Sequence, residues 1–233
     1  MVWGRLRRAV SGATDWAIGT ADFARAVLPR RAPTDGVATG RQVVVLPGIL
    51  ENPRYLTPLV TRLRAEGNRV TVVDSLGFNL HRLDASVERT LSELTHARVR
   101  DAVIVAHSKG GLIGKALLLD PRSEGLLVGM VAVATPFAGS LLWARAQRNT
   151  AVNASPLGLF HPEHPDLARL HAACAVNPRI VSLAPRYDQV VPGGSHLEGA
   201  GNETLPVAGH FRAVRDPACL TVIAARVASF GVP

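Results

Sequence analysis

Residues 102–111 read Ala-Val-Ile-Val-Ala-His-Ser-Lys-Gly-Gly, and they carry the strongest structural signal in the chain. Residues 102–106 are a continuous apolar, largely β-branched run, which is typical of a strand buried on both faces. Apolar residues then recur at helical spacing as far as Leu119. The stretch predicts a buried strand, a tight turn at Ser108 and a helix.

The same alternation of apolar runs and amphipathic segments extends along the rest of the chain. Five further strands are predicted, over residues 42–46, 69–74, 128–134, 180–183 and 204–207. Helical periodicity predicts helices over residues 56–63, 83–94, 112–119 and 222–230. Solid apolar strands that alternate with helices indicate βαβ units. We therefore expect an α/β fold with a mostly parallel central sheet of about six strands, flanked by helices.

Two segments depart from this alternation. A charged linker that contains Pro and Gly ends near residue 36, so residues 1–36 are predicted to be an amphipathic helical extension with its linker. Residues 37–233 then form a single domain. Within it, residues 140–177 contain several prolines and no clear strand, and long segments of this kind are often functional lids. A short lid-like insertion is expected there.

Composition limits the classes of protein that the chain can belong to. Its 233 residues are enough for one domain with a sizeable core, and its net charge is +8. Two cysteines cannot supply a disulfide framework, so Cys174 and Cys219 are expected to be reduced. Nucleic-acid binding is not expected, because the chain has few aromatics and its basic residues are dispersed beyond the linker.

The N-terminal extension carries half of the basic excess. Residues 1–31 hold six arginines and two aspartates, a net charge of +4, beside apolar residues at helical spacing. Such a helix can lie on an anionic bilayer, or it can dock on the domain or on a partner chain. Docking is favoured, because most amphipathic helices serve packing. Asp15, Asp22 and Arg25 interrupt any signal-peptide core, so a cytoplasmic protein with no cleavable signal peptide is expected, with membrane association as the alternative.

The turn at Ser108 has small residues two positions before and two positions after it, Ala106 and Gly110. A strand, this turn and a helix together resemble the nucleophile elbow of the α/β-hydrolase family, in particular small bacterial lipases and esterases with Ala-His-Ser-x-Gly. Ala106 replaces the more usual glycine and adds one methyl group. Residues 135–140, Thr-Pro-Phe-Ala-Gly-Ser, are similar to a Thr-Pro-His-x-Gly-Ser segment of such lipases, with Phe137 in place of the histidine.

The resemblance implies a catalytic triad in the chain order serine, acid, histidine. Ser108 would be the nucleophile, Asp188 follows the strand predicted over residues 180–183, and His210 follows the last predicted strand. Each of these residues, taken alone, has an ordinary structural explanation, and their order after three strands favours the triad. The alternatives are Asp166 or Asp216 as the acid and His196 as the base.

The resemblance also implies an oxyanion hole and an apolar pocket. The backbone N–H groups of Lys109 and Ile49 are the expected oxyanion donors, with Leu50 as the alternative to Ile49. The expected lining of the pocket is Leu50, Phe137, Leu141 and Trp143. Two roles remain open for the Lys109 side chain, which is either solvated or selective for an anionic substrate.

The implied activity is hydrolysis of a carboxylic ester, as in a lipase or esterase, with a small-molecule or lipid ester as substrate. A thioesterase, amidase or acyltransferase would use the same triad, and a protein that kept the fold without catalysis is a further alternative. No cofactor is expected. No metal is expected either, because the histidines and acids of residues 161–171 lack a His-Glu-x-x-His pattern. The oligomeric state is not predicted.

Overall fold

The computed structural model describes residues 12–17, 19–20, 40–140 and 155–231. Six strands form one sheet in the order β2-β1-β3-β4-β5-β6, and every neighbouring pair is parallel. The strands are β1 (Gln42–Leu46), β2 (Arg69–Val72), β3 (Ala102–His107), β4 (Leu127–Val133), β5 (Ile180–Tyr187) and β6 (Gly201–Ala208). The prediction of a parallel six-stranded sheet is confirmed.

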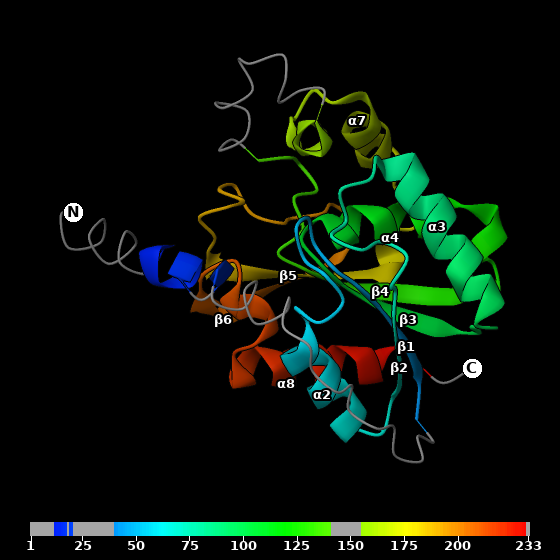
Figure 1. The fold of residues 1–233 in the computed structure, drawn as a ribbon. Coiled ribbons are helices and arrows are strands. Elements are labelled where there is room, and N and C mark those ends of the chain that lie inside the picture. The colour runs from blue at the N-terminus through cyan, green and yellow to red at the C-terminus, as the bar shows by residue number, and fades with distance from the viewer. Residues whose placement is uncertain (1–11, 18, 21–39, 141–154, 232–233) are drawn as a thin grey trace.

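Helices cover both faces of the sheet (Figure 1). They are α2 (Thr57–Ala65), α3 (Leu83–His96), α4 (Lys109–Leu119), α7 (Pro165–Ala172) and α8 (Pro217–Ser229). Figure 1 shows α3, α4 and α7 above the sheet and α2 and α8 below it. Short 3₁₀ turns lie at Pro121–Ser123, Pro156–Phe160, Asn177–Arg179 and Arg212–Val214.

The apolar strands divide their side chains between two cores. In β3, Ala102 and Ile104 belong to the core beneath α3 and α4, whereas Val103 and Val105 belong to the core beneath α2 and α8. Successive side chains of a strand point to opposite faces, so a strand buried on both faces must be apolar throughout. This requirement explains why the strands are solid apolar runs in the sequence.

The order of the strands determines where a ligand can bind. The chain passes from β1 to the edge strand β2 and then returns to β3 on the other side of β1. Loops that leave adjacent parallel strands in opposite directions open a crevice at the carboxyl ends of those strands. The loop after β1 and the turn after β3 meet at this crevice.

Several boundaries differ from the prediction. Strand β2 ends at Val72, two residues early, whereas β5 continues to Tyr187, where it still pairs with Ala208 of β6. The extension of β5 is made by backbone pairing and not by apolar side chains, so hydropathy could not reveal it. It carries the chain directly to Asp188.

The region predicted as a lid is helical in its described part. Residues Pro156–Phe160 form a 3₁₀ turn, and α7 buries Leu167 and Leu170 in the core that also contains residues of α4. A lid function for residues 140–177 stays a prediction, because residues 141–154 lie outside the described residues.

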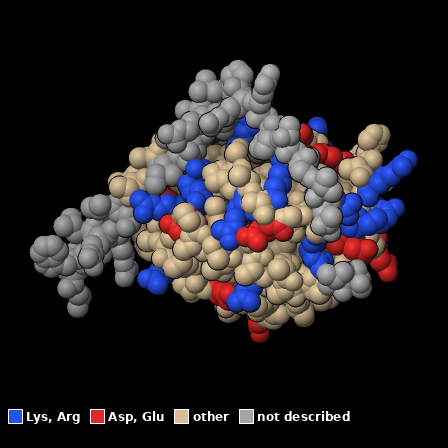
Figure 2. Space-filling model, turned by 90° about the horizontal axis from the view of Figure 1, so that it is seen from below, with Lys and Arg blue, Asp and Glu red and all other residues tan. Residues whose placement is uncertain are grey.

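The surface charge of the described residues is mixed. Figure 2 shows arginine and lysine side chains interspersed with acidic ones on one face. No helix in the described part of the chain is both long enough and apolar enough to cross a bilayer.

Candidate active site

Ser108 lies at the turn between β3 and α4, in a backbone conformation that side chains rarely adopt. Its φ is 51° and its ψ is −121°, and it is largely buried, with 6% of its surface exposed. A non-glycine residue held in such a region costs about 1–3 kcal/mol and persists only where the surrounding structure enforces it. Here the amide of Ser108 donates to the Val133 carbonyl at 2.9 Å, which ties the turn to the neighbouring strand β4.

Close packing around the turn explains the small residue at position 110. A Cβ atom on Gly110 would lie 2.5 Å from the carbonyl oxygen of Leu46 and 2.8 Å from that of Pro47. Both are backbone atoms, which cannot move aside cheaply. The glycine therefore lets the start of α4 approach the loop that follows β1.

We expect Gly110→Ala to lower the free energy of unfolding by about 1–3 kcal/mol, the usual cost of forcing extra atoms into a packed core. Urea denaturation followed by circular dichroism measures this difference. Gly201→Ala is the matched control, because its Cβ would meet its nearest atom at 3.7 Å. Equal stability of the two variants would contradict the packing argument.

Asp188 and His210 form a buried hydrogen-bonded pair at the ends of β5 and β6. Asp188 Oδ2 lies 2.7 Å from His210 Nδ1. The other oxygen of Asp188, Oδ1, accepts hydrogen bonds from the amides of Val190 and Val191, both at 2.8 Å. The carboxylate is thus oriented by the turn that follows it, and it holds Nδ1 of His210 as a donor.

The electrostatic attraction between Asp188 and His210 shifts the pKa of each side chain in the direction that favours its charged form. Burial raises the pKa of the Asp188 carboxyl, but attraction to His210 and the hydrogen bonds that it accepts outweigh burial and bring this pKa below its ordinary value. Burial lowers the pKa of His210, but its attraction to Asp188, reinforced by Glu51 and Asp15, brings this pKa above 6.5. Three anionic groups therefore stabilise a positive charge on the imidazole.

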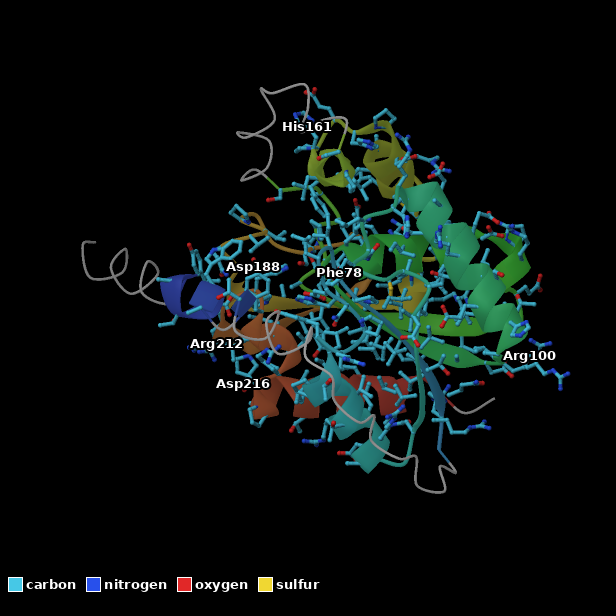
Figure 3. All side chains as sticks on the ribbon, viewed as in Figure 1. Phe78, Arg100, His161, Asp188, Arg212 and Asp216 are labelled. Carbon is cyan, nitrogen blue, oxygen red and sulfur yellow. The ribbon has the colours of Figure 1, made fainter. Side chains whose placement is uncertain are left out.

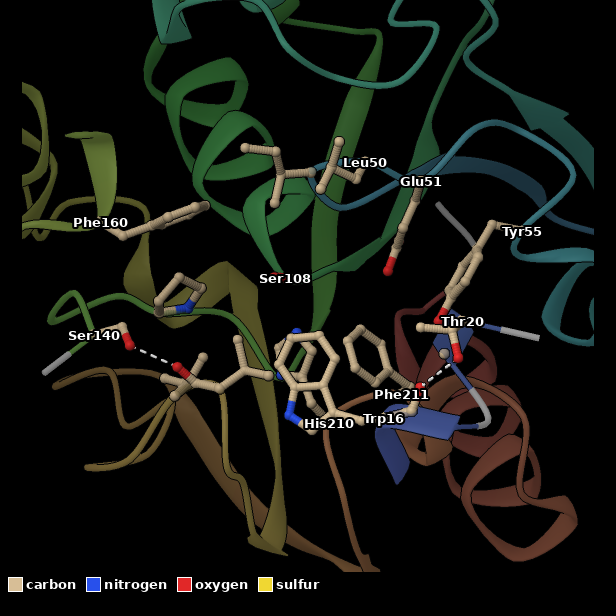
Figure 4. Close-up of a pocket in the computed structure, with 15 residues that line it drawn as sticks. Trp16, Thr20, Leu50, Glu51, Tyr55, Ser108, Ser140, Phe160, His210 and Phe211 are labelled. Atoms are coloured by element: carbon tan, nitrogen blue, oxygen red, sulfur yellow. Dashed lines mark hydrogen bonds between the residues drawn. The ribbon is translucent and has the colours of Figure 1, made fainter. Parts of the chain in front are cut away.

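Ser108 and His210 line the same cavity, which has a volume of about 260 Å³ (Figure 4). Its wall is mainly apolar and includes Ile49, Leu50 and Phe160. Within the described residues, no hydrogen bond joins Ser108 Oγ to His210 Nε2, although both residues border the cavity.

The backbone amides of Ile49 and Lys109 are unpaired within the described part of the chain. The amide of Leu50, the alternative donor, is already bonded to the Phe78 carbonyl at 2.8 Å. The neighbouring amide of Gly48 is bonded to Glu51 Oε2 at 2.6 Å. The hydrogen bonds of Leu50 and Gly48 thus leave Ile49, of the residues in the loop after β1, as the predicted oxyanion donor.

The Lys109 side chain has neither of the roles left open by the sequence. It is fully buried, and its ammonium group donates to the carbonyl oxygens of Asn79 at 2.8 Å and His81 at 2.6 Å. Burial lowers the pKa of Lys109 to about 8. The lysine ties the start of α4 to the loop between β2 and α3, so it neither points into solvent nor meets a substrate.

Of the predicted pocket residues, the structure places Leu50 in the wall of the cavity and Phe137 outside that wall. Leu50 lines the cavity and has 51% of its surface exposed. Phe137 is buried in the core on the α4 side of the sheet, and its neighbour Pro136 lines the cavity instead. Leu141 and Trp143 lie outside the described residues.

The alternative acids and base are not brought to His210. Asp166 pairs with Arg169 on α7 at 3.1 Å, Asp216 caps the start of α8 by accepting from the Ala218 amide, and His196 is exposed. Figure 3 shows Asp188 beside the N-terminal helical turns, with Asp216 lower down near α8. Asp188 is thus the acid that reaches the histidine.

Sequence reasoning missed a second buried acid–histidine pair next to the first. Glu51 Oε1 lies 2.6 Å from His107 Nδ1, and His107 Nε2 lies 3.2 Å from the backbone oxygen of His210. The rings of His107 and His210 are 4.8 Å apart. Since the carbonyl of His210 can only accept, Nε2 of His107 donates to it, and one proton lies between Nδ1 and Glu51. Together with the bond from Gly48 to Glu51, these contacts join the loop after β1 to the histidine loop.

Solved structures share this arrangement of sheet and helices. The structure is similar to a mature lipase from Bacillus licheniformis, with 13% identity, a TM-score of 0.64, and coverage of 86% of this chain and 96% of that one. The chain has the α/β-hydrolase fold. A hydrolase from Pseudomonas aeruginosa matches with 21% identity and a TM-score of 0.55, over 84% of this chain and 91% of that one. Naproxen esterase from Bacillus subtilis matches with 15% identity and a TM-score of 0.55, over 82% and 85% of the two chains.

No protein-family model matches the sequence, and no curated protein matches it. The hydrolase fold is therefore established by structural likeness, and the chemistry has to be argued from the site. Among the described residues of the hydrolase fold, no group of three or more His, Cys, Asp or Glu side chains is placed to hold a metal ion.

Proposed function

We propose that the protein is a serine hydrolase that cleaves carboxylic esters through an acyl-enzyme. The observation that carries the proposal is the buried hydrogen bond between Asp188 and His210. His210 and Ser108 line the same apolar cavity, close to the amides of Ile49 and Lys109. An apolar cavity with a few convergent polar groups is the arrangement expected of a binding site.

In the proposed reaction, Ser108 Oγ attacks the ester carbonyl carbon while His210 Nε2 accepts the serine proton. The carbonyl oxygen becomes an oxyanion, which accepts hydrogen bonds from the amides of Ile49 and Lys109. The bond to the alcohol oxygen then breaks, and the imidazolium returns the proton to that alcohol. Water repeats the sequence on the acyl-enzyme, with His210 as base, and releases the carboxylic acid.

Asp188 has two proposed roles in this cycle. Its bond to Nδ1 keeps the imidazole in the tautomer whose Nε2 lone pair faces the cavity, and its charge stabilises the imidazolium formed during attack. The hydrogen bonds from the amides of Val190 and Val191 support both roles, because they hold the carboxylate in place and ionised.

The expected substrate is an ester with a short or medium acyl chain. A cavity of about 260 Å³ lies just below the range of roughly 300–1,000 Å³ that holds drug-sized ligands. We expect kcat/KM for p-nitrophenyl esters to be highest for short and medium chains and to fall for long ones. A profile that rises steadily to the longest chain would contradict this expectation and favour a lipase that acts at a lipid interface.

The pH dependence follows from the electrostatics of His210. The base must be neutral, and the neighbouring anions hold its pKa above 6.5, so activity falls as the pH drops through this raised value. We expect the acid limb of kcat/KM to have its midpoint above 6.5. A midpoint below that of an ordinary histidine would contradict the proposed surroundings of the base.

A panel of substrates separates esters from the other acyl donors that use the same triad. We expect turnover of p-nitrophenyl esters to exceed that of matched acyl thioesters and anilides. Faster thioester cleavage, or transfer of the acyl group to an added alcohol in preference to water, would replace ester hydrolysis by a thioesterase or acyltransferase function.

A further inference from the structure

The N-terminal segment, defined here as residues 12–17 and 19–20, lies against the loop that carries His210. Its residues are helical, although the strands of the sheet begin only at Gln42. Figure 3 shows the segment, in blue, next to Asp188 and Arg212. An extension that served only solubility or membrane contact would not need specific contacts at this place.

Asp15 anchors the segment to both loops of the acid–histidine pair. It is fully buried, and it accepts hydrogen bonds from the amides of Phe211 at 3.0 Å and Arg212 at 2.9 Å, the two residues after His210. It also accepts a bond of 2.6 Å from the side-chain amide of Gln189, whose oxygen in turn accepts from the His210 amide at 3.3 Å. Asp15 therefore constrains the backbone on both sides of the pair.

Two glycines make this close approach feasible. A Cβ atom on Gly209 would lie 2.3 Å from Asp15 Oδ1, and Gly209 has a φ of 125°, which favours glycine. On the segment itself, a Cβ atom on Gly19 would lie 2.7 Å from the Phe211 ring. Both surfaces of the contact thus lack the side-chain atoms that would prevent it.

The segment also forms part of the cavity wall. Trp16, Gly19 and Thr20 line the cavity together with Ser108 and His210 (Figure 4). The Trp16 ring meets the Phe211 ring edge-on at 5.2 Å, and Phe211 meets His210 in the same way at 5.2 Å. Trp16 remains 44% exposed, so it borders the opening of the cavity.

We propose that the N-terminal segment is a working part of the active site, in which Asp15 is a positioning residue for His210 and Trp16 limits the length of the group that the cavity accepts. This inference rests on the proposed serine-hydrolase function. Among the described residues, the charged and titratable groups that face His210 are Asp188 from the loop after β5, Glu51 from the loop after β1, His107 from β3, and Asp15 from the segment.

The role of Trp16 is tested with alkyl fluorophosphonates of short and long chain, in which Ser108 Oγ displaces fluoride from phosphorus. On the full chain, we expect Trp16→Ala to raise the ratio of long-chain to short-chain labelling rates by about tenfold or more, because removing a wall lets apolar groups bind that were excluded. Leu80→Ala is the matched control: Leu80 is 48% exposed but does not line the cavity, so the ratio stays unchanged.

The role of Asp15 is tested by Asp15→Asn, which is expected to lower kcat by roughly 10- to 100-fold through misplacement of the base. Loss of the negative charge also lowers the pKa of His210, so the acid limb moves to lower pH, a change that a merely structural role would not produce. Glu124→Gln is the control, because it removes one exposed acid just before β4, at the amino ends of the strands and away from their carboxyl ends, where the site lies.

The outcomes separate this inference from the proposed function. Normal labelling of Ser108 with an unchanged chain-length ratio in Trp16→Ala and an unchanged acid limb in Asp15→Asn would overturn the inference and leave the hydrolase intact. If Asp15→Asn does not fold, the chain-length ratio of Trp16→Ala decides. Absence of Ser108 labelling in the parent protein would overturn both.

Discussion

Asp188→Asn is expected to lower kcat for ester hydrolysis by about 10⁴-fold while leaving the fold intact. The amide of asparagine can donate to His210 Nδ1, which favours the tautomer that carries its hydrogen on Nε2. That hydrogen then faces the cavity, where a base needs a lone pair, and the negative charge that stabilises the imidazolium is lost. Steady-state kinetics with a short-chain p-nitrophenyl ester measures the effect.

Asp216→Asn is the matched control for this variant. Asp216 is the acid of the same region that caps α8, and asparagine is an equally good cap, so activity and stability should remain close to those of the parent. A large loss of activity in Asp216→Asn with little loss in Asp188→Asn would show that Asp188 is not the acid of the triad.

Glu51→Ala is expected to have the largest effect on stability, lowering the free energy of unfolding by about 3–5 kcal/mol. Glu51 is 4% exposed and serves two buried groups, the His107 ring and the Gly48 amide. Alanine leaves both of these buried groups without their partner. Urea denaturation of the parent and the variant measures the difference.

Glu51→Gln separates the hydrogen bonds of Glu51 from its charge. A glutamine can donate to His107 Nδ1 and accept from the Gly48 amide, so every bond of the pair is kept when His107 is neutral with its hydrogen on Nε2. We expect stability close to that of the parent, because each hydrogen bond of the pair keeps a donor and an acceptor. A loss of stability as large as that of Glu51→Ala would contradict this bonding scheme.

The central strands of the sheet could be predicted from the sequence, because strands buried on both faces must be apolar throughout. The runs around Val44, Ile104 and Val131 have no polar face, and each occupies the centre of the parallel sheet. The site residues that follow strand ends could also be predicted. Parallel strands bring their carboxyl ends to one edge, which places Ser108, Asp188 and His210 together once the strands are known.

The remaining parts of the site depend on contacts that leave no local pattern. Lys109 is buried because two backbone carbonyls of a distant loop bind its ammonium group, and Phe137 packs in the core while Pro136 lines the cavity. Glu51 and His107 are 56 positions apart, and Asp15 reaches amides almost two hundred positions away. Only the folded chain brings such pairs together.

Asp15 and Trp16 make the contacts through which the described part of the N-terminal helix docks on the domain. Their contacts are those of a segment that packs on the domain, at the place where a substrate would enter. Most of residues 1–36, including Trp3 and Phe23, lies outside the described residues, so membrane contact through that part stays a hypothesis.

The mass of the intact protein after exposure to a fluorophosphonate shows whether Ser108 is a nucleophile activated by His210. We expect addition of one phosphonyl group to the parent protein, on the peptide that contains Ser108, and no addition to Ser108→Ala. We also expect labelling to be slowed by several orders of magnitude in His210→Ala. An unlabelled parent, or equal labelling of Ser108→Ala, would rule out Ser108 as the nucleophile.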